Sequence, residues 1–576
     1  MKRVLLLGGA MQQIPSILKA KELGYYTITC DYLPNNPGHK LADEYYNVST
    51  TNQESVLKLA KNLNIDGIVA YASDPAAPTA AYVAEQLGLP GNPYESVKIL
   101  TQKDLFREFL SLHGFTTPKA KGFDSYDEAE KVIDSFKFPV MVKPVDSSGS
   151  KGVVKIFERA ELETAVKEAL SYSMKKRFII EEFIEKKGYQ VSGDGFSVDG
   201  ELVFTSYGNE LYSDKGTREY VALGEFWPSE LSAEQKAKVD TELQRLITAL
   251  GMRTSAYNIE VILDKDDNVY ILELGPRNGG SYIPQLIQYA TGIDMIEYTL
   301  KAAVGEDCSG LHMTETKGFW SNYMILSTVS GVFKELSFDE QFRTNNLLEV
   351  HCTYNPGDIV TAYQNTSHSL GTILFKANSL KEMLKLINNI EECYKVVVDD
   401  FPTEIKSNLR GKEKHILMVP LYSSAQKEYA MRMCDAAFVR SVLKREDYLS
   451  LFQKVDFRAD FCAAYTDDVI GYAAMYANDL QSKTAYITLI AVRRENQKAG
   501  VGSALIAWCE STAIGRGMRQ LRLEVAKDNT NARSFYERHG FCYEAGQKEG
   551  SLYMRKSLEA IGEKECSDFS MRREQQ

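Results

Sequence analysis

The chain has 576 residues, of which 44% are hydrophobic and 25% are charged, and its formal net charge is −11. At about 150 residues per domain, this length predicts several domains with cores of their own. The acidic balance argues against nucleic acid as a partner, because phosphate backbones are bound by basic surfaces. The nine cysteines are odd in number and scattered along the chain. That usage is typical of a reducing compartment, so we expect a cytoplasmic protein.

The first hundred residues predict an open α/β layer. Strand and helix patterns alternate in the order strand 4–7, helix to 23, strand 26–30, helix 53–63, strand 67–71 and helix 76–87. The opening apolar run is too short for a signal peptide or a membrane span. Gly8 and Gly9 follow it without the G-x-G-x-x-G spacing, so we do not expect a dinucleotide here.

A possible phosphate-binding loop follows the first layer. A strand at 139–143 ends in Lys143 and leads into a loop of small residues at 144–153. Small residues let backbone N–H groups approach phosphate oxygens, and the lysine adds a positive charge. Lys103 precedes this loop at the start of a helical pattern. A plain turn between two strands is the common alternative for such a loop.

The next strand pattern offers a site for a flat ring. The apolar run at 178–184 contains Glu181 and Glu182 and precedes a second strand pattern at 189–198. An apolar strand with polar groups at its edge can hold an adenine ring. A core strand with a solvated end explains the same pattern equally well.

Two strand patterns, at 258–263 and 269–274, flank a polar turn and predict a hairpin. If the turn is its centre, Glu260 lies directly opposite Glu273, where paired Cβ atoms are about 4.5–5.5 Å apart and like charges repel. A cation removes this repulsion. Together with the amide of Asn278, the two carboxylates form an oxygen ligand set suited to Mg²⁺. The alternative is a hairpin whose glutamates face solvent.

Arg277 and the pair Gly279-Gly280 follow the hairpin at once. They offer a guanidinium fork and exposed backbone N–H groups to an anionic oxygen. The loop, the apolar strand and the hairpin, in this order and at roughly this spacing, resemble the ATP-grasp superfamily over about residues 1–405. The resemblance implies that ATP phosphorylates a carboxylate and that an amine attacks the acyl phosphate to give an amide. The segment after the hairpin looks most like the amino-acid ligase branch.

The resemblance implies roles for individual residues. Those implied to bind ATP are Lys103, Lys143, Ser148, Gly149, Gly152, Glu181, Glu182, Phe183, Ile184 and Gln190. Mg²⁺ or Mn²⁺ is implied to be held by Glu260 and Glu273, with a third ligand from Asn278 or water. Arg277 is implied to be catalytic, holding the acyl phosphate or the substrate carboxylate. Two positions depart from the family. Gly275 stands where Asn is frequent, and Gln190 stands where the family often has a Glu that binds the ribose.

Two further segments complete the first part. Lys215 and Arg218 lie in a polar stretch at 213–220 that is a candidate for a mobile substrate loop, although a charge cluster is usually a solvated face. Short strand patterns from 331 to 398, with a helix at 380–390, predict a small closing subdomain.

A second module begins after a polar segment at 406–414, which we interpret as a linker. Strand patterns lead into a glycine-containing segment at 493–503 that opens a helix, and a second helix at 529–539 follows another strand. Backbone N–H groups at such a helix start bind anions. The alternative is a glycine-rich helix start with no ligand.

The sequences QKAGVG at 497–502 and NARSFYERHGF at 531–541 together resemble the GNAT acyltransferase family over about residues 415–560. Residues implied to bind acetyl-CoA are Val492, Gln497, Lys498, Gly500, Val501, Gly502, Ser503 and Asn531. Tyr536 is implied to protonate the leaving thiolate, which requires hydrogen-bond reach of the sulfur. Tyr536 as a core residue is the alternative. Glu524 is a candidate base for the acceptor amine, and a solvent-facing strand position explains it equally well.

We therefore predict an α/β and α+β multidomain enzyme. Its parts are a pre-ATP-grasp α/β domain at 1–100, an ATP-grasp domain at 101–310, a closing subdomain at 311–405, a linker at 406–414, a GNAT domain at 415–560 and a polar tail at 561–576. The expected partners are a small-molecule carboxylate and an amine, with no nucleic acid and no membrane, and a homo-oligomer is left open. One alternative is a carboxylase-type enzyme, which ranks below ligation because nothing in the sequence resembles a biotin carrier segment. The other is that one module is reduced to sensing nucleotide or CoA.

Overall fold

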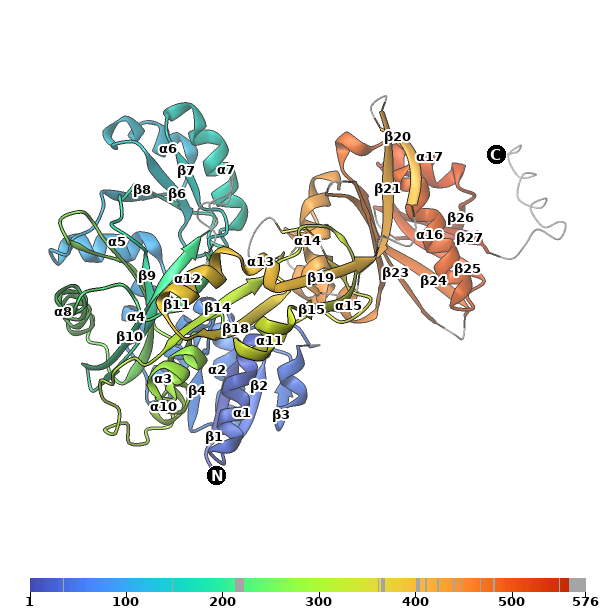
Figure 1. The fold of residues 1–576 in the computed structure, drawn as a ribbon. Helices are drawn as coiled ribbons and strands as arrows, with labels where there is room; N and C mark the ends of the chain where they lie inside the picture. The colour runs from blue at the N-terminus through green and yellow to red at the C-terminus, as the bar shows by residue number, and fades with distance from the viewer. Residues whose placement is uncertain are drawn as a thin grey trace, which may run out of the picture. The chain divides into compact units, whose positions relative to one another are not determined.

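The computed structural model describes residues 1–558 except positions 35, 148, 213–221, 361, 364–367, 400–403, 410–411, 422–423, 439–440, 446, 467, 480–481 and 549. The chain forms two compact units, Met1–Val398 and Asp399–Gln576. Both units mix helices and strands, as Figure 1 shows, which confirms the predicted fold class.

The first unit opens with a parallel sheet of strand order β3-β2-β1-β4. Its elements are β1 (Arg3–Leu7), α1 (Ile14–Glu22), β2 (Tyr26–Cys30), β3 (Glu44–Tyr46), α2 (Gln53–Leu63), β4 (Gly67–Val69) and α3 (Ala77–Leu87). Gly9 after β1 is explained by packing, because a Cβ there would lie 2.2 Å from Cε1 of His39. The His39 ring is fixed by Thr29 Oγ1 at 3.0 Å from Nδ1 and by Leu33 O at 3.1 Å from Nε2.

A four-stranded antiparallel sheet of order β5-β8-β6-β7 follows. Its elements, with the helices before it, are α4 (Tyr94–Leu100), α5 (Lys103–Leu112), β5 (Ala120–Phe123), α6 (Tyr126–Glu130), β6 (Val140–Pro144), β7 (Val154–Ile156), α7 (Leu162–Tyr172) and β8 (Phe178–Glu182). Helix α7 buries Leu162, Ala165, Val166 and Ala169. Their spacing places all four on one helical face, and that face packs on the sheet.

The largest sheet of the first unit, called the largest sheet below, has the order β13-β12-β9-β10-β11-β14-β18-β16 and is antiparallel throughout. Its strands are β9 (Val191–Val198), β10 (Glu201–Tyr212), β11 (Ala222–Trp227), β12 (Ser255–Leu263), β13 (Val269–Gly275), β14 (Phe319–Ile325), β16 (Leu347–Cys352) and β18 (Gly371–Ala377). Three helices accompany it, α8 (Ala233–Ala249), α9 (Ile283–Thr291) and α10 (Met295–Ala303). Helix α8 begins with a capping box, in which Ser232 and Gln235 each bond the backbone N–H of the other.

The segment predicted as a closing subdomain does not stand apart. Strands β14, β16 and β18 continue the largest sheet. A small sheet of order β17-β15-β19 completes the unit. Its elements and the neighbouring helices are β15 (Gly331–Phe338), α11 (Glu340–Asn345), β17 (Ile359–Val360), α12 (Leu380–Asn388), α13 (Ile390–Cys393) and β19 (Tyr394–Asp399).

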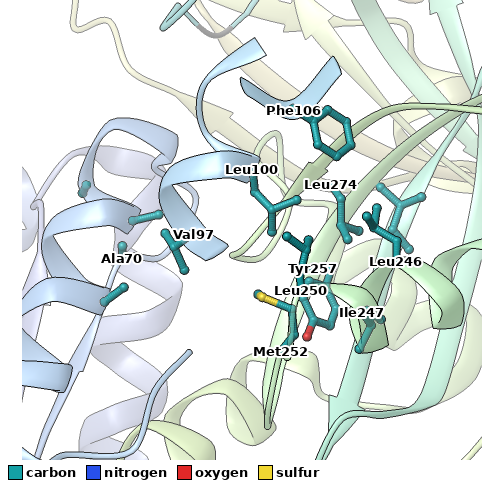
Figure 2. Close-up of a cluster of buried hydrophobic side chains, with 14 of the residues drawn as sticks. Ala70, Val97, Leu100, Phe106, Leu246, Ile247, Leu250, Met252, Tyr257 and Leu274 are labelled. Atoms are coloured by element: carbon teal, nitrogen blue, oxygen red, sulfur yellow. The ribbon is translucent and has the colours of Figure 1, made fainter. Parts of the chain in front are cut away.

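One hydrophobic core joins the first α/β layer to the largest sheet. Figure 2 shows Ala70 after β4 and Val97 and Leu100 on α4 together with Tyr257 of β12 and Leu274 of β13. Each fully buried large side chain contributes about 1.5–3 kcal/mol to stability. Residues 1–100 therefore share a core with the following sheet rather than folding around one of their own.

The second unit is built on a sheet of order β20-β21-β22-β23-β24-β25-β27-β26. Its elements are β20 (Glu404–Leu409), β21 (Lys412–Pro420), α14 (Ser424–Cys434), α15 (Tyr448–Arg458), β22 (Asp460–Tyr465), β23 (Val469–Asp479), β24 (Thr484–Val492), α16 (Val501–Gly515), β25 (Gln520–Ala526), α17 (Thr530–Arg538), β26 (Cys542–Lys548) and β27 (Ser551–Ser557). The prediction of a linker at 406–414 is wrong for most of that segment, because β20 and β21 pair as an antiparallel hairpin. The predicted tail at 561–576 lies outside the described residues.

Candidate active sites

A pocket of about 740 Å³ lies within the first unit. Its lining brings together the first α/β layer through Asp74, the four-stranded sheet through Lys143 and Glu181, and the largest sheet through Glu260 and Glu273. The first and the last of these residues are about two hundred positions apart in the chain, and they line one cavity. Most of the side chains that the sequence assigned to ATP line this pocket.

The predicted opposition of two glutamates is confirmed. Glu260 of β12 pairs directly with Glu273 of β13. The register shifts by one residue between Glu260 and Val261, so this pairing depends on a β-bulge. Arg107 of α5 is 4% exposed and donates from its two terminal nitrogens to Ile271 O at 3.2 Å and Leu272 O at 3.0 Å. The guanidinium therefore binds the bulged strand just before Glu273.

The electrostatics of the hairpin fit a bound cation. Burial, together with the carboxylates of Glu210 and Glu273, raises the pKa of Glu260 well above its usual range. Lys103 Nζ lies 3.4 Å from Glu273 Oε2 and donates to Ser147 O at 3.1 Å. A divalent ion between the glutamates would favour their charged forms. Among the described residues, no group of three or more acidic, His or Cys side chains is arranged to hold a metal ion.

The structure does not bring Asn278 to the metal carboxylates. Its side chain is fully buried, and its Oδ1 accepts a hydrogen bond from Thr299 Oγ1 at 2.8 Å. It lines a separate cavity of about 90 Å³ rather than the large pocket. The prediction of Asn278 as a metal ligand is therefore wrong, because the chain turns after β13 and directs this amide toward α10. Water remains the other source that the sequence left open.

Arg277 lines the pocket, but part of its guanidinium group already makes hydrogen bonds within the protein. Its Nε and Nη2 donate to the two carboxylate oxygens of Asp74 at 2.6 and 2.5 Å, and its Nη1 donates to Asn278 O at 2.9 Å. Burial acts against the charge of Asp74, yet the guanidinium lowers the pKa of that carboxyl overall. Three of the five N–H groups of the arginine are thus used, and two are left for a substrate oxygen. Asp74 was not predicted, because it comes from the first layer.

The first of the two glycines after Arg277 serves a different purpose from the predicted one. The backbone N–H of Gly279 donates to both carboxylate oxygens of Asp194, at 2.9 and 3.0 Å. Burial raises the pKa of Asp194 to about 6, although the Gly279 bond opposes this shift. Gly279 is therefore not free to bind a substrate anion. Gly280 lines the large pocket.

The residues predicted around the nucleotide form a buried ion network. Glu181 is 2% exposed, its Oε2 lies 2.7 Å from Lys143 Nζ, and its Oε1 lies 3.0 Å from Arg107 Nε. Burial opposes ionisation, but the two cations lower the pKa of Glu181 to about 2. Glu182 accepts from the backbone N–H of Lys137 at 2.9 Å. Phe183 and Ile184 line the pocket beside them, where an apolar wall suits a base.

The phosphate loop has the conformation that its glycines predict. Gly149 and Gly152 have φ values of 67° and 71°, in the left-handed region. A Cβ on Gly152 would lie 2.9 Å from the ring of Tyr172. Ser148 lies outside the described residues, as do Lys215 and Arg218 of the predicted substrate loop.

Gln190 lies between two acidic groups. Its Nε2 donates to Glu210 Oε2 at 2.5 Å and to Glu260 Oε2 at 3.2 Å. Tyr212 also donates to Glu210 Oε2, at 2.7 Å. Sequence reasoning missed Glu210 and its neighbour Glu225, although a charged residue inside an apolar strand pattern is the signal that marks both.

The second unit opens a gap between two parallel strands. Strand β24 pairs with β25 only from Thr484 to Ile487, although both strands continue further. Beyond the pairing, Val492 O accepts from Gln497 Nε2 at 3.1 Å, and the chain enters α16 through Gly500 in the left-handed conformation at φ 82°. Val501, Gly502 and Ser503 form the first turn of α16, whose free N–H groups suit an anion.

Of the two predicted catalytic residues of the second unit, Glu524 follows the paired stretch of β25 directly, whereas Tyr536 lies in α17. Tyr536 of α17 is 8% exposed, packs against Phe535 and Phe541, and belongs to the core of the unit. Burial raises the pKa of its phenol strongly, which keeps the proton on an acid. Glu524 of β25 accepts from Ser551 Oγ at 2.6 Å and is not fully exposed. Lys498 has a left-handed φ of 64°, and Asn531 at the start of α17 is exposed.

Comparison with known proteins defines the class of each unit. Residues 136–285 match the ATP-grasp domain model, and residues 427–541 match the acetyltransferase (GNAT) family model. The chain therefore carries an ATP-grasp domain followed by a GNAT acetyltransferase domain, and both are families of enzymes.

Individual relatives are similar to about half of the chain. An uncharacterised protein of Sinorhizobium fredii is 27% identical over 274 residues, which are 46% of this chain and 55% of that protein. The carbamoyl phosphate synthase large chain of Thermotoga petrophila is 26% identical over 291 residues, 50% of this chain but 26% of the synthase. The chain thus matches about half of the first relative and a quarter of the second.

Solved structures share the fold of the first unit. The L-amino acid ligase of Bacillus licheniformis aligns with a TM-score of 0.61 at 22% identity, covering 69% of this chain and 99% of the ligase. The phosphoribosylglycinamide synthetase of Anaerococcus prevotii aligns with a TM-score of 0.56 at 24% identity, covering 69% and 100%. The biotin carboxylase domain of a Hydrogenobacter thermophilus 2-oxoglutarate carboxylase, solved with MgADP and bicarbonate, aligns with a TM-score of 0.56 at 19% identity, covering 69% of this chain and 90% of that domain.

Within the described residues, no helix is both long and apolar enough to cross a bilayer.

Proposed function

We propose that the chain is a bifunctional enzyme. The first unit is an ATP- and Mg²⁺-dependent ligase that joins a carboxylate to an amine, and the second is an acetyl-CoA-dependent N-acetyltransferase. The observation that carries the ligase assignment is the opposition of Glu260 and Glu273 in a pocket that also receives Lys103, Lys143 and Arg277.

The chemistry follows from the charges of the pocket. A substrate carboxylate oxygen attacks the γ-phosphorus of ATP, ADP leaves, and an acyl phosphate forms. The amine nitrogen then attacks the acyl carbon, phosphate leaves, and the nitrogen loses a proton to give the amide. Lys103, Lys143 and the two remaining N–H groups of Arg277 stabilise the negative charge on the transferred oxygens. Glu260 and Glu273 would hold Mg²⁺, which neutralises the phosphate oxygens when it is bound.

In the second unit, the backbone at the start of α16 is proposed to bind the pyrophosphate of acetyl-CoA, with Asn531 at the pantetheine arm. The amine of the acceptor attacks the thioester carbon, and the thiolate leaves. Tyr536 would donate a proton to that thiolate and Glu524 would accept one from the amine. The restricted pairing of β24 with β25 supports this assignment, because it leaves main-chain groups of both strands unpaired toward each other.

A direct test measures phosphate release from ATP and Mg²⁺ with the twenty standard L-amino acids, each offered alone and in pairs. The proposal predicts release that requires both a carboxylate and an amine. A second candidate is a carboxylase-type reaction, which is favoured by the shared fold with the biotin carboxylase domain. Release that depends on bicarbonate and needs no amine would replace the ligase assignment by that candidate.

A further inference from the structure

A histidine of the second unit contacts the first turn of α16. His539 directly follows α17, and its Nε2 lies 2.9 Å from Ser503 Oγ. Its Nδ1 lies 2.8 Å from the backbone oxygen of Phe535. Both contacts fall within residues 427–541, the range that matches the acetyltransferase family. Ser503 is among the residues expected to bind acetyl-CoA, whereas the proposed mechanism gives His539 no task.

Close packing of the two helices holds the imidazole in this position. The ring centroids of Phe535 and His539 are 4.3 Å apart, and the ring planes are tilted by 41°. Gly502 allows this approach, because a Cβ there would lie 3.0 Å from Cζ of Phe535. The end of α17 therefore lies against the start of α16, with Ser503 exposed and His539 partly buried.

The partner of Nδ1 decides which nitrogen of the neutral ring carries the hydrogen. The backbone oxygen of Phe535 can only accept, so Nδ1 must donate to it. In the neutral imidazole Nε2 is then an acceptor, and the hydroxyl of Ser503 must donate its single hydrogen to it. The hydroxyl oxygen then offers only lone pairs to its surroundings, and lone pairs repel a phosphate oxygen.

Protonation of the imidazole reverses the direction of this bond. Both nitrogens of a protonated histidine are donors, so Nε2 donates to Ser503 Oγ and the hydroxyl hydrogen becomes available to an anion. The ring also brings a positive charge to the first turn of α16, whose N–H groups already favour an anion. An imidazole ordinarily changes its charge between about pH 5 and 8.

Charged groups on the neighbouring elements have partners of their own. Glu510 of α16 pairs with Lys556 of β27 at 2.5 Å, and Glu537 of α17 accepts from Tyr543 of β26 at 2.6 Å. The side chains of Arg538 in α17 and Lys498 before α16 are exposed. Among the described residues, His539 thus contacts α16 through a neutral hydroxyl rather than through a carboxylate.

We propose that His539 is a positioning residue of the acetyl-CoA site, which acts through the Ser503 hydroxyl and strengthens binding of the pyrophosphate when the imidazole is protonated. The neutral ring takes the hydroxyl hydrogen for itself, and the protonated ring releases it to a phosphate oxygen. The inference rests on the proposed acetyltransferase function and adds a regulation of that site by pH.

Equilibrium binding tests this proposal without the acceptor amine, whose reactivity also changes with pH. The probe is dephospho-CoA, which keeps the pyrophosphate but lacks the 3′-phosphate, a group that itself titrates at about pH 6. Calorimetry on the full chain gives its Kd at about pH 5.5 and about pH 8.5, on either side of the range in which an imidazole titrates. The variants are His539→Gln, which keeps a hydrogen-bonding side chain that does not titrate, and Ser503→Ala. Ser534→Ala, at an exposed position of α17, is the matched control.

The wild type and the control should bind dephospho-CoA about three- to tenfold more tightly at the lower pH. This is less than for a buried hydrogen bond to a charged group, because the site is exposed. His539→Gln should show the same Kd at both pH values, and Ser503→Ala should lose most of the difference. A wild-type Kd that is equal at both pH values or lower at the higher one, or a full difference that survives either substitution, would overturn the role of His539. If neither dephospho-CoA nor acetyl-CoA binds the wild type at either pH, the proposed acetyltransferase function itself is refuted.

Discussion

Arg107 provides the sharpest structural prediction, because a single buried guanidinium joins the nucleotide wall to the metal hairpin. It pairs with Glu181, which is 2% exposed, and donates to the two carbonyls of the β13 bulge. Arg107→Met leaves the buried Glu181 carboxylate with one of its two ion-pair partners, Lys143, and leaves two carbonyls without this donor. Breaking a buried ion pair in this way costs about 3–5 kcal/mol.

Urea unfolding of the first unit measures this loss. The chain has three tryptophans, two of them in the first unit, so a Trp508→Phe background restricts the fluorescence signal to that unit. The matched control is Arg159→Met, since Arg159 is 48% exposed and pairs with Asp134, which is 71% exposed. The control should cost at most about 1 kcal/mol. A free energy of unfolding for Arg107→Met within 0.5 kcal/mol or so of the control would refute the reasoning.

Three further predictions concern the separate sites. Glu273→Ala should abolish ATP turnover and leave acetyl transfer intact, while Gly500→Trp should do the reverse; loss of both activities in either folded variant would contradict independent units. Tyr536→Phe should lower the kcat of acetyl transfer about a hundredfold or more with the KM for acetyl-CoA retained, and full activity would make Tyr536 a core residue only. Burial and the Glu225 carboxylate raise the pKa of Glu210 to about 8, and burial with the carboxylates of Glu260 and Asp194 raises the pKa of Glu225 to about 7, from an ordinary value of 4.5. The stability that their neutral forms contribute is therefore complete below pH 4.5 and is lost as pH rises toward 8. Glu210→Gln should therefore gain stability relative to the wild type between pH 5 and 8 without Mg²⁺ or nucleotide, and a difference in unfolding free energy that does not change with pH would count against the repulsion.

The sequence was sufficient where a contact lies within one local pattern. Two alternating strands around a polar turn predicted the pairing of Glu260 with Glu273, and the structure confirms it. The prediction nevertheless assumed an unbroken ladder. Beside the turn, the two strands pair one residue out of step with the pairing of the glutamates. The bulge after Glu260 removes this offset and brings Glu260 opposite Glu273. The alternation of apolar and polar residues does not reveal a bulge. Arg107, which binds the carbonyls at the bulge, comes from another element of the chain.

Contacts between distant segments were beyond the sequence. Asp74 meets Arg277 from 203 positions away, and a single carboxylate after a strand gives no sign of that partner. Glu225 lies opposite Glu210 across a segment that the sequence showed only as polar. Asn278 was assigned to the metal from proximity in sequence, whereas the turn after β13 carries its amide to Thr299.

The linker at 406–414 was mistaken for a different reason. Most of that segment lies in two paired strands, β20 and β21. Charge alone indicates solvent exposure, which an edge hairpin of a sheet provides as well as a linker does. The composition of residues 406–414 therefore predicted an exposed segment, but it did not predict that the backbone pairs as a hairpin.

The most direct test of the ligase assignment follows oxygen atoms from the carboxylate. The accepted carboxylate is prepared with an isotopic label in both oxygens, and the full chain is given ATP, Mg²⁺ and the amine. Transfer of one labelled oxygen to inorganic phosphate for each amide formed, abolished by Glu273→Ala, is the expected result. Amide formation with unlabelled phosphate, or label transfer that survives the loss of Glu273, would contradict the assignment of this hairpin to carboxylate activation.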